Sequence, residues 1–70
     1  MPKYRFHIDG PKPYADATGT MLADDRVAWQ EARRRVRDIE DDLQPGEEWR
    51  LEVLKDEKPV FVVTLSSRRV

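Results

Sequence analysis

The chain has 70 residues and 39% of them are charged, but 13 basic and 14 acidic side chains leave a formal net charge of only −1. This length fits one domain, residues 1–70, and the charge balance gives no overall attraction to nucleic acid or anionic lipid. The sequence contains no cysteine, which excludes disulfides and thiolate metal sites and indicates a reducing compartment, the cytoplasm. Residues 1–5 lack the apolar run of a signal peptide, and residues 60–63, the longest apolar stretch, are too short to span a membrane.

The first expected element is a strand over residues 4–8, where apolar and polar side chains alternate. One face of this strand carries Tyr4, Phe6 and Ile8, and the other carries Arg5 and His7. An Asp-Gly pair follows, which is typical of a turn, and two prolines then prevent regular pairing. We expect residues 14–21 to form a short returning strand that is broken by a glycine at position 19.

A helix is predicted over residues 24–43, because apolar residues recur there with helical spacing. The stripe consists of Trp29, Ala32, Val36, Ile39 and Leu43, with Ala28 beside it. Asp24 is expected to cap the first turn, and Asp25 suits the positive end of the helix dipole. A Pro-Gly pair at residues 45–46 ends the pattern.

Two further strands are expected over residues 49–54 and 60–65, joined by a loop at residues 56–59. Trp49, Leu51 and Val53 share one face of the first strand, whereas the second strand is apolar on both faces. Residues 66–70 are expected to form a loose tail.

The order strand, short strand, helix, strand, strand predicts an α+β fold in which one helix lies across one face of a small antiparallel sheet. The residues expected to face the helix are Tyr4, Phe6, Ile8, Leu51, Val53, Phe61, Val63 and Leu65. The residues expected on the outer face are Arg5, His7, Arg50, Glu52, Leu54, Val60, Val62 and Thr64.

The opening residues Met1 to Ile8, followed by Asp9-Gly10, resemble a family of short proteobacterial proteins known only as a domain of unknown function. Its members open M-P-x-Y-x-F-H and continue with a D-x-x-G segment, here residues 16–19, and an L-x-D segment, here residues 22–24. They end in two strands around an acidic turn, here residues 55–58. This chain departs from the pattern at Asp25, where a leucine is usual, at Pro59 near the turn, and in its larger number of helix arginines. The resemblance implies the architecture and no activity.

No residue set in the sequence predicts catalysis, a metal or a cofactor. His7 is the only histidine, and a metal site needs several ligands that converge. Ser66 and Ser67 have no second histidine or elbow motif that would make either a nucleophile. The acidic pairs at residues 24–25 and 41–42 are helix neighbours, which point about 100° apart and therefore do not converge.

The helix arginines offer one candidate surface. Arg26, Arg33 and Arg37 are spaced along one flank, and with Arg34 they are candidate nucleic-acid contacts. The pairs Glu31–Arg35, Arg34–Asp38 and Arg37–Asp41 have the i, i+4 spacing of helix ion pairs, which would neutralise much of this charge. A solvated face is therefore favoured, and a protein or nucleic-acid contact stays open.

The outer sheet face offers the second candidate surface. Leu54, Val60 and Val62 would form an apolar strip there, rimmed by Arg5, His7, Arg50 and Glu52. Either a partner covers this strip, or the tail or the proline loop folds over it.

The favoured hypothesis is a non-enzymatic module that associates through this face, most simply as a two-fold homodimer that an edge strand could extend. The alternative is a weak nucleic-acid-binding or regulatory protein that uses the arginines, and an enzyme is the least favoured class. We expect no membrane partner.

Overall fold

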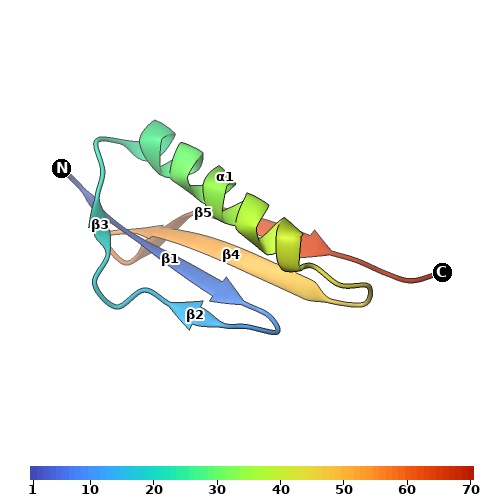
Figure 1. Ribbon diagram of the computed structural model, residues 1–70. Coiled ribbons are helices and arrows are strands. Elements are labelled where there is room, and N and C mark those ends of the chain that lie inside the picture. Colours follow the sequence, from blue (N-terminus) through green and yellow to red (C-terminus); the bar gives the residue numbers. More distant parts are fainter.

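The three segments in which apolar and polar side chains alternate form the long strands of the computed structural model, which describes residues 1–70 (Figure 1). The elements are β1 (Lys3–Asp9), β2 (Tyr14–Ala15), β3 (Thr20–Met21), α1 (Asp25–Asp42), β4 (Glu48–Lys55) and β5 (Lys58–Ser66). The α+β class and the single helix across one face of an antiparallel sheet are confirmed. Two short strands replace the single short strand that was predicted.

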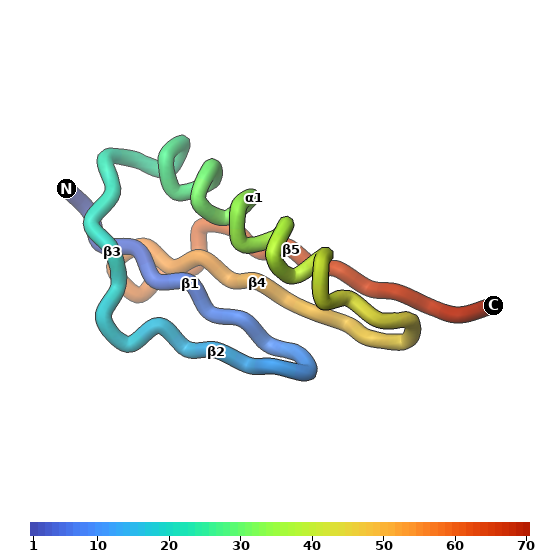
Figure 2. The backbone as a smooth tube through the Cα atoms, viewed as in Figure 1, coloured from blue at the N-terminus to red at the C-terminus, as the bar shows by residue number.

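The sheet has the order β2-β1-β4-β5, and β3 also pairs with β1, on the side away from β4. All pairs are antiparallel. One edge of the sheet is therefore β5, and the other consists of β2 and β3 in succession. The molecule is elongated, with principal extents of 45 × 20 × 16 Å, and its termini lie at opposite ends (Figure 2).

The returning segment after β1 is broken by a loop of residues 16–19 rather than by one glycine. Asp16 holds this loop, because its carboxylate accepts hydrogen bonds from the backbone N–H of Gly19 at 2.9 Å and of Thr18 at 3.2 Å. Gly19 has a φ of +80°, which residues with a side chain adopt only with strain. The predicted direction of the segment is confirmed, and its interruption is longer than predicted.

The β4–β5 hairpin turns over two residues, Asp56 and Glu57, so the predicted loop of residues 56–59 was too long. Both residues have positive φ values, 50° and 71°, as two-residue hairpin turns that match strand twist require. Further along, Val53 pairs with Phe61 but Leu54 pairs with Pro59. Val60 is therefore the extra residue of a β-bulge in β5.

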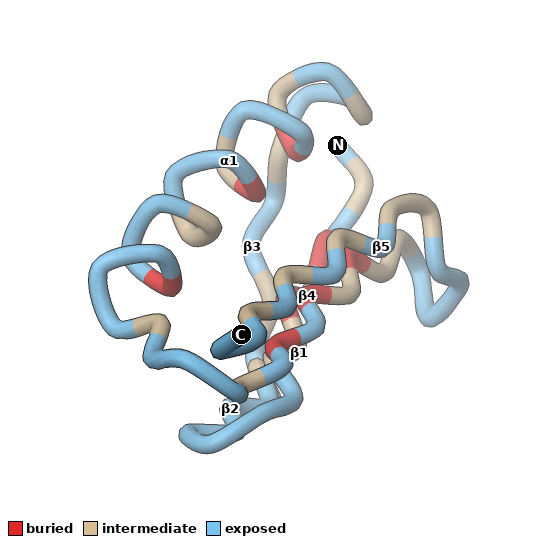
Figure 3. Tube along the Cα trace, turned by 90° about the vertical axis from the view of Figure 1, so that its right-hand side faces the viewer, coloured by how far each residue is buried: buried red, intermediate tan, exposed pale blue.

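Helix α1 has the predicted limits. The Asp24 carboxylate accepts a hydrogen bond from the Val27 backbone N–H at 3.0 Å, which confirms Asp24 as the N-cap, and Leu43 is the C-cap. The fully buried helix residues Ala28 and Ala32 are small, so the helix lies close to the sheet. Figure 3 shows the buried residues gathered between α1 and the sheet, and no element covers the opposite sheet face.

The buried core matches the predicted face, with one correction in the helix. The buried residues are Tyr4, Phe6, Ala28, Ala32, Ile39, Trp49, Leu51 and Val53, and Ile8, Val36, Phe61 and Val63 pack against them. Trp29 was predicted in this core but is 41% exposed, and its ring contacts that of Phe61 at a centroid distance of 5.1 Å with the two planes tilted by 52°. Arg35 places its guanidinium 4.4 Å from the centroid of the Phe6 ring. The helix is therefore rotated so that Ala28, Ala32 and Ile39 face the sheet and Trp29 lies at the margin of the core.

The expected loose tail begins later than predicted. Ser66 belongs to β5, and Ser67 exchanges two backbone hydrogen bonds of 2.9 Å with the turn before β4. In these bonds the Ser67 N–H donates to the Glu47 carbonyl, and the Gly46 N–H donates to the Ser67 carbonyl. Only residues 68–70 lie beyond the last regular hydrogen bonds of the chain.

Candidate functional site

The outer sheet face brings together most of the residues that the sequence assigned to it. Residues that pair across neighbouring strands lie on the same face of the sheet. Arg5 of β1 pairs with Leu54 of β4. His7 of β1 pairs with Glu52 of β4, and Glu52 pairs in turn with Val62 of β5. Val62 is 49% exposed.

The charges on this face are partly matched within the chain. Arg5 forms an ion pair with Glu57 at 3.0 Å, and Arg50 forms one with Glu52 at 3.3 Å. The face is therefore a mixed surface in which only a small apolar area remains, at Leu54 and Val62.

Val60 does not join this apolar strip. Without the bulge, strict alternation would place Val60 on the outer face beside Val62. The extra residue changes the alternation, and Val60 packs against the core cluster. The predicted outer position of Val60 is therefore wrong, because strand periodicity was extended through a bulge that the sequence did not reveal.

The open edge of β5 is uncharged over most of its length. Residues 59–67 form the longest run without Asp, Glu, Lys or Arg in the chain, and β5 has β4 as its only strand neighbour. Lys58, Pro59 and the bulge protect the beginning of this edge, as charges, prolines and bulges commonly do. From Phe61 to Ser66 none of these devices is present.

A hollow of about 310 Å³ lies between α1 and this edge. It is lined by Trp29, Arg33, Val36, Arg37, Glu40 and Val63, and the tilted Trp29–Phe61 ring contact continues it along β5. A larger hollow of about 560 Å³ beside residues 46–48 and 66–68 has no hydrophobic lining residue, so it offers no apolar anchor. We call the hollow between α1 and β5 the edge groove.

Three charged groups on the rim of the edge groove have no ion-pair partner in the chain. These are Arg33, Arg37 and Glu40. The predicted pair Glu31–Arg35 is present at 3.6 Å, but the predicted pairs of Arg34 with Asp38 and of Arg37 with Asp41 are absent. Arg34 turns instead to Glu31 at 3.4 Å. A glutamate that precedes its basic partner is the better helix order, which explains why Glu31 holds both arginines.

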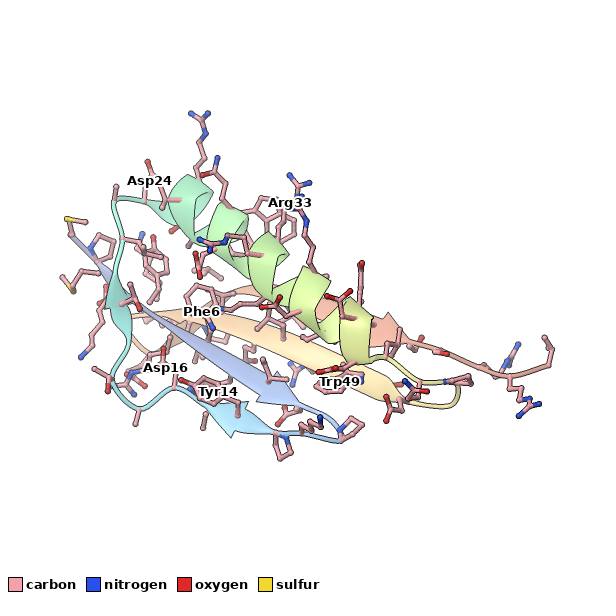
Figure 4. All side chains as sticks on the ribbon, viewed as in Figure 1. Phe6, Tyr14, Asp16, Asp24, Arg33 and Trp49 are labelled. Atoms are coloured by element: carbon pink, nitrogen blue, oxygen red, sulfur yellow. The ribbon has the colours of Figure 1, made fainter.

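The predicted basic surface is partly assembled. Arg33, Arg34 and Arg37 line a shallow hollow of about 210 Å³ together with Gln30, whereas Arg26 is not among the residues that line it. Figure 4 shows Arg33 projecting outward from α1. Arg33 and Arg37 belong to both this hollow and the edge groove.

A second polar cluster joins the start of α1 to the sheet. The buried Tyr4 hydroxyl donates a hydrogen bond to the Asp25 carboxylate at 2.6 Å, and the Lys55 ammonium lies 3.3 Å from the same oxygen. Burial, followed by this hydrogen bond, raises the pKa of Tyr4 to about 12. The hydrogen bond from Tyr4 is the main reason that the pKa of Asp25 is lowered. Because Asp25 at the start of α1 binds both Tyr4 of β1 and Lys55 of β4, the cluster is a structural link between the helix and the sheet.

The structure contains no group of three or more His, Cys, Asp or Glu side chains that could hold a metal ion. His7 lies opposite Glu52 in the ladder, and Ser66 and Ser67 lie at the end of β5, far along the chain from any histidine. No helix has the length and apolar character that crossing a bilayer requires.

The comparisons with known proteins give one match. A protein-family model, described as Domain of unknown function (DUF6894), matches residues 3–66. Neither the curated proteins nor the solved structures give a match. The matched range contains the whole sheet and the whole of α1.

Proposed function

The chain belongs to the DUF6894 family, and from that premise we propose that it is a non-enzymatic association module that binds a second copy of itself along the edge of β5. The observation that carries this proposal is the uncharged edge strand from Phe61 to Ser66. An open strand edge presents unpaired N–H and C=O groups to any other chain. Segments of high β-propensity with no charge and no proline are also the ones most prone to pair.

The surroundings of this edge support the proposal. Val62, at 49% exposed, and Trp29, at 41% exposed, are large apolar side chains beside β5. Val62 lies on the outer face of the sheet and Trp29 lies on the helix side. A chain that pairs with β5 would therefore cover apolar surface on both faces. The outer-face residues Arg5, His7, Arg50, Glu52 and Leu54 then flank this contact rather than form its centre.

The oligomeric state of the wild-type chain tests the proposal. We expect sedimentation to show a monomer–dimer equilibrium between micromolar and millimolar concentration. Replacing Thr64 of β5 by lysine should weaken this association by about tenfold or more, because it would place two ammonium groups close together on one face of the joined strands.

Thr20→Lys is the matched control, because Thr20 is an exposed threonine on the opposite sheet edge. This variant should associate as the wild type does, and thermal melts should show that both variants fold. A wild type that stays monomeric at millimolar concentration would refute self-association. Equal weakening by both variants would refute the assignment to β5.

A second candidate function is weak nucleic-acid binding, favoured by the hollow that Arg33, Arg34 and Arg37 share. Phosphate contacts release counterions, so such binding must weaken steeply as salt rises. Titration of the wild type with RNA and DNA at two salt concentrations tests this function. Affinity that falls with salt and is lost when the three arginines are replaced by glutamine would establish it, and no affinity at low salt would eliminate it.

Three finer points belong to the same proposal. A cytoplasmic location is supported by the absence of cysteine. A proteobacterial origin and a shared M-P-x-Y-x-F-H opening follow from the resemblance noted in the sequence. Fractionation of the source cells, with detection of the chain by antibody, checks the location.

A further inference from the structure

We infer that two copies pair through antiparallel β5 strands around a two-fold axis at Val63, so that Arg33 of one copy meets Glu40 of the other, while Arg37 lies near the axis. This inference rests on the proposed function and adds the geometry of the contact and the groups that determine its specificity. The occupant of the edge groove is thus the same groove of a second copy.

The helix gives the first estimate of the axis. Arg33 and Glu40 are seven residues apart, which is about two helical turns, and they line the same side of the edge groove. Neither has an ion-pair partner within the chain. A two-fold contact is self-complementary, so an axis midway between a basic and an acidic group brings each to its opposite. The midpoint lies at Val36 and Arg37.

The strand gives a second estimate of the axis. Val63 lines the edge groove together with Val36. A two-fold axis at the level of Val36 and Arg37 in α1 would therefore pass through β5 at Val63. The uncharged run of residues 59–67 also has Val63 as its midpoint. Pairing around Val63 would oppose Phe61 to Leu65 and Val62 to Thr64 of the second copy, with no charge in the contact.

The spacing across such a pair suits the side chains involved. Because neighbouring strands are about 4.8 Å apart, the two β4 strands would be separated by about 14 Å. Helix α1 contacts β4 and β5, so the two helices would lie at this separation or less. This leaves room for Trp29 and Val36 above the joined strands, and it is a distance that an arginine and a glutamate reaching toward each other can bridge.

Charge reversal followed by mixing tests this arrangement. One variant carries Arg33→Glu and Arg37→Glu, and the other carries Glu40→Arg. Each alone places like charges across the axis, so sedimentation should show association weakened by about tenfold. An equal mixture restores opposite charges and should associate at least as strongly as the wild type, with native mass spectrometry showing the mixed pair. Arg26→Glu, outside the groove, is the control and should have no effect.

The cysteine-free sequence allows a test of the register. Opposed residues in antiparallel strands are close enough for a disulfide, whereas residues more than about 7 Å apart are not. Under mild oxidation, Val62→Cys and Thr64→Cys should each give little dimer alone and a cross-linked pair when mixed. Strong self-cross-linking of either variant would move the axis to that residue and refute the register.

The outcomes separate this inference from the proposed function. A wild type that dimerises but ignores both charge variants would overturn the helix contact while self-association stands. A wild type that stays monomeric would refute both. Binding of an acidic peptide or of RNA to a monomer, with loss of binding in the variant carrying Arg33→Glu and Arg37→Glu, would assign the edge groove to that other partner and overturn the inference.

Discussion

The two edges of the sheet both carry unpaired backbone groups, but they differ in how far they prevent pairing with another chain. The edge formed by β2 and β3 consists of two pieces of two residues each, separated by a loop and preceded by two prolines. The edge formed by β5 is a single strand of nine residues. Both leave backbone groups without a strand neighbour on one side, but only the first is interrupted along its length.

This difference shows what protects an edge strand. Short strands, prolines and charges prevent pairing with other chains, and at β5 such devices occur only at the beginning, in Lys58, Pro59 and the bulge at Val60. A chain that is 39% charged but places no charge from Phe61 to Ser66 leaves this segment free to pair. The contrast supports the β5 edge as the proposed contact surface more strongly than the hydrophobicity of either face does.

The largest expected effect is a loss of overall stability that affects both edges of the sheet. Leu51 of the central strand β4 is fully buried, and Leu51→Ala should lower the free energy of unfolding by about 2–5 kcal/mol. Because small domains have little net stability, amide hydrogen exchange should accelerate at both edges together. Denaturant unfolding and hydrogen exchange measure this. Unchanged exchange at either edge would show that the edges are not parts of one cooperative unit.

A pH-dependent effect is expected on the side of the interrupted edge, where Tyr4 pairs with Thr20 of β3. Burial and its hydrogen bond to Asp25 raise the pKa of Tyr4 from 10.0 to about 12, so the neutral hydroxyl is favoured in the folded state. Its contribution is complete below pH 10.0 and is lost as the pH rises toward about 12. The wild type should lose stability over this interval, as urea unfolding at several pH values will measure.

Tyr14→Phe is the matched control for this prediction, because Tyr14 is the other tyrosine of the chain and is 52% exposed on β2. This variant should keep the alkaline loss of stability, whereas Tyr4→Phe should lose that dependence. The same alkaline loss in both variants would contradict the role given to Tyr4.

A smaller and local effect is expected from Asp16→Ala. The carboxylate accepts two backbone hydrogen bonds in the loop between β2 and β3, and their loss should lower the free energy of unfolding by about 1 kcal/mol. Hydrogen exchange should accelerate at β2 and β3 and stay unchanged at β5.

The Asp16 carboxylate should also make the stability of the fold depend on pH in the acidic range. The hydrogen bond from Gly19 is the main reason that the pKa of Asp16 lies below its ordinary value of 3.8. The wild-type contribution is therefore complete above pH 3.8 and is lost as the pH falls through the lowered pKa. Asp16→Ala should lack this part of the acid dependence, and an unchanged acid dependence in the variant would contradict the assignment.

The smallest effect is a gain in stability at the turn that leads into β5. Glu57 has a φ of 71°, and Glu57→Gly should raise the free energy of unfolding by about 0.5 kcal/mol, because glycine adopts this conformation without the steric penalty. In its ion pair with Arg5, the Glu57 side chain is 68% exposed, and solvent screening at this end keeps the loss of the pair small. Asp56→Gly should give a smaller gain, since aspartate tolerates positive φ better than glutamate. A thermal melt ranks the two variants.

The regular parts of the fold follow from patterns in the sequence. Alternation located three strands to within two residues at each end, and Asp24 marked the start of α1. The rotation of α1 was not predictable in the same way, because Trp29 and Ala28 are neighbours and helical spacing alone does not show which of the two faces the sheet. Ala28 and Ala32 face the sheet since only small residues permit the close approach that the large rings of β1 need.

The contact surface was harder to predict than the fold. The sequence placed Val62 on the surface correctly, but it could not show the bulge that turns Val60 toward the core. A single extra residue in one strand leaves no mark in composition or spacing. The position of β5 at the sheet edge depends on which strands pair, and that follows from long-range packing rather than from any local pattern. The uncharged run of residues 59–67 was nevertheless a visible signal.

The loop that separates β2 from β3 has a consequence for stoichiometry. In the proposed dimer, the outer borders of the combined sheet would be the two interrupted edges, in which residues 16–19 break the line of strand groups. A third copy would then find no continuous strand to extend, and growth would close at two copies instead of continuing into a filament. Static light scattering of concentrated protein should level off at twice the monomer mass.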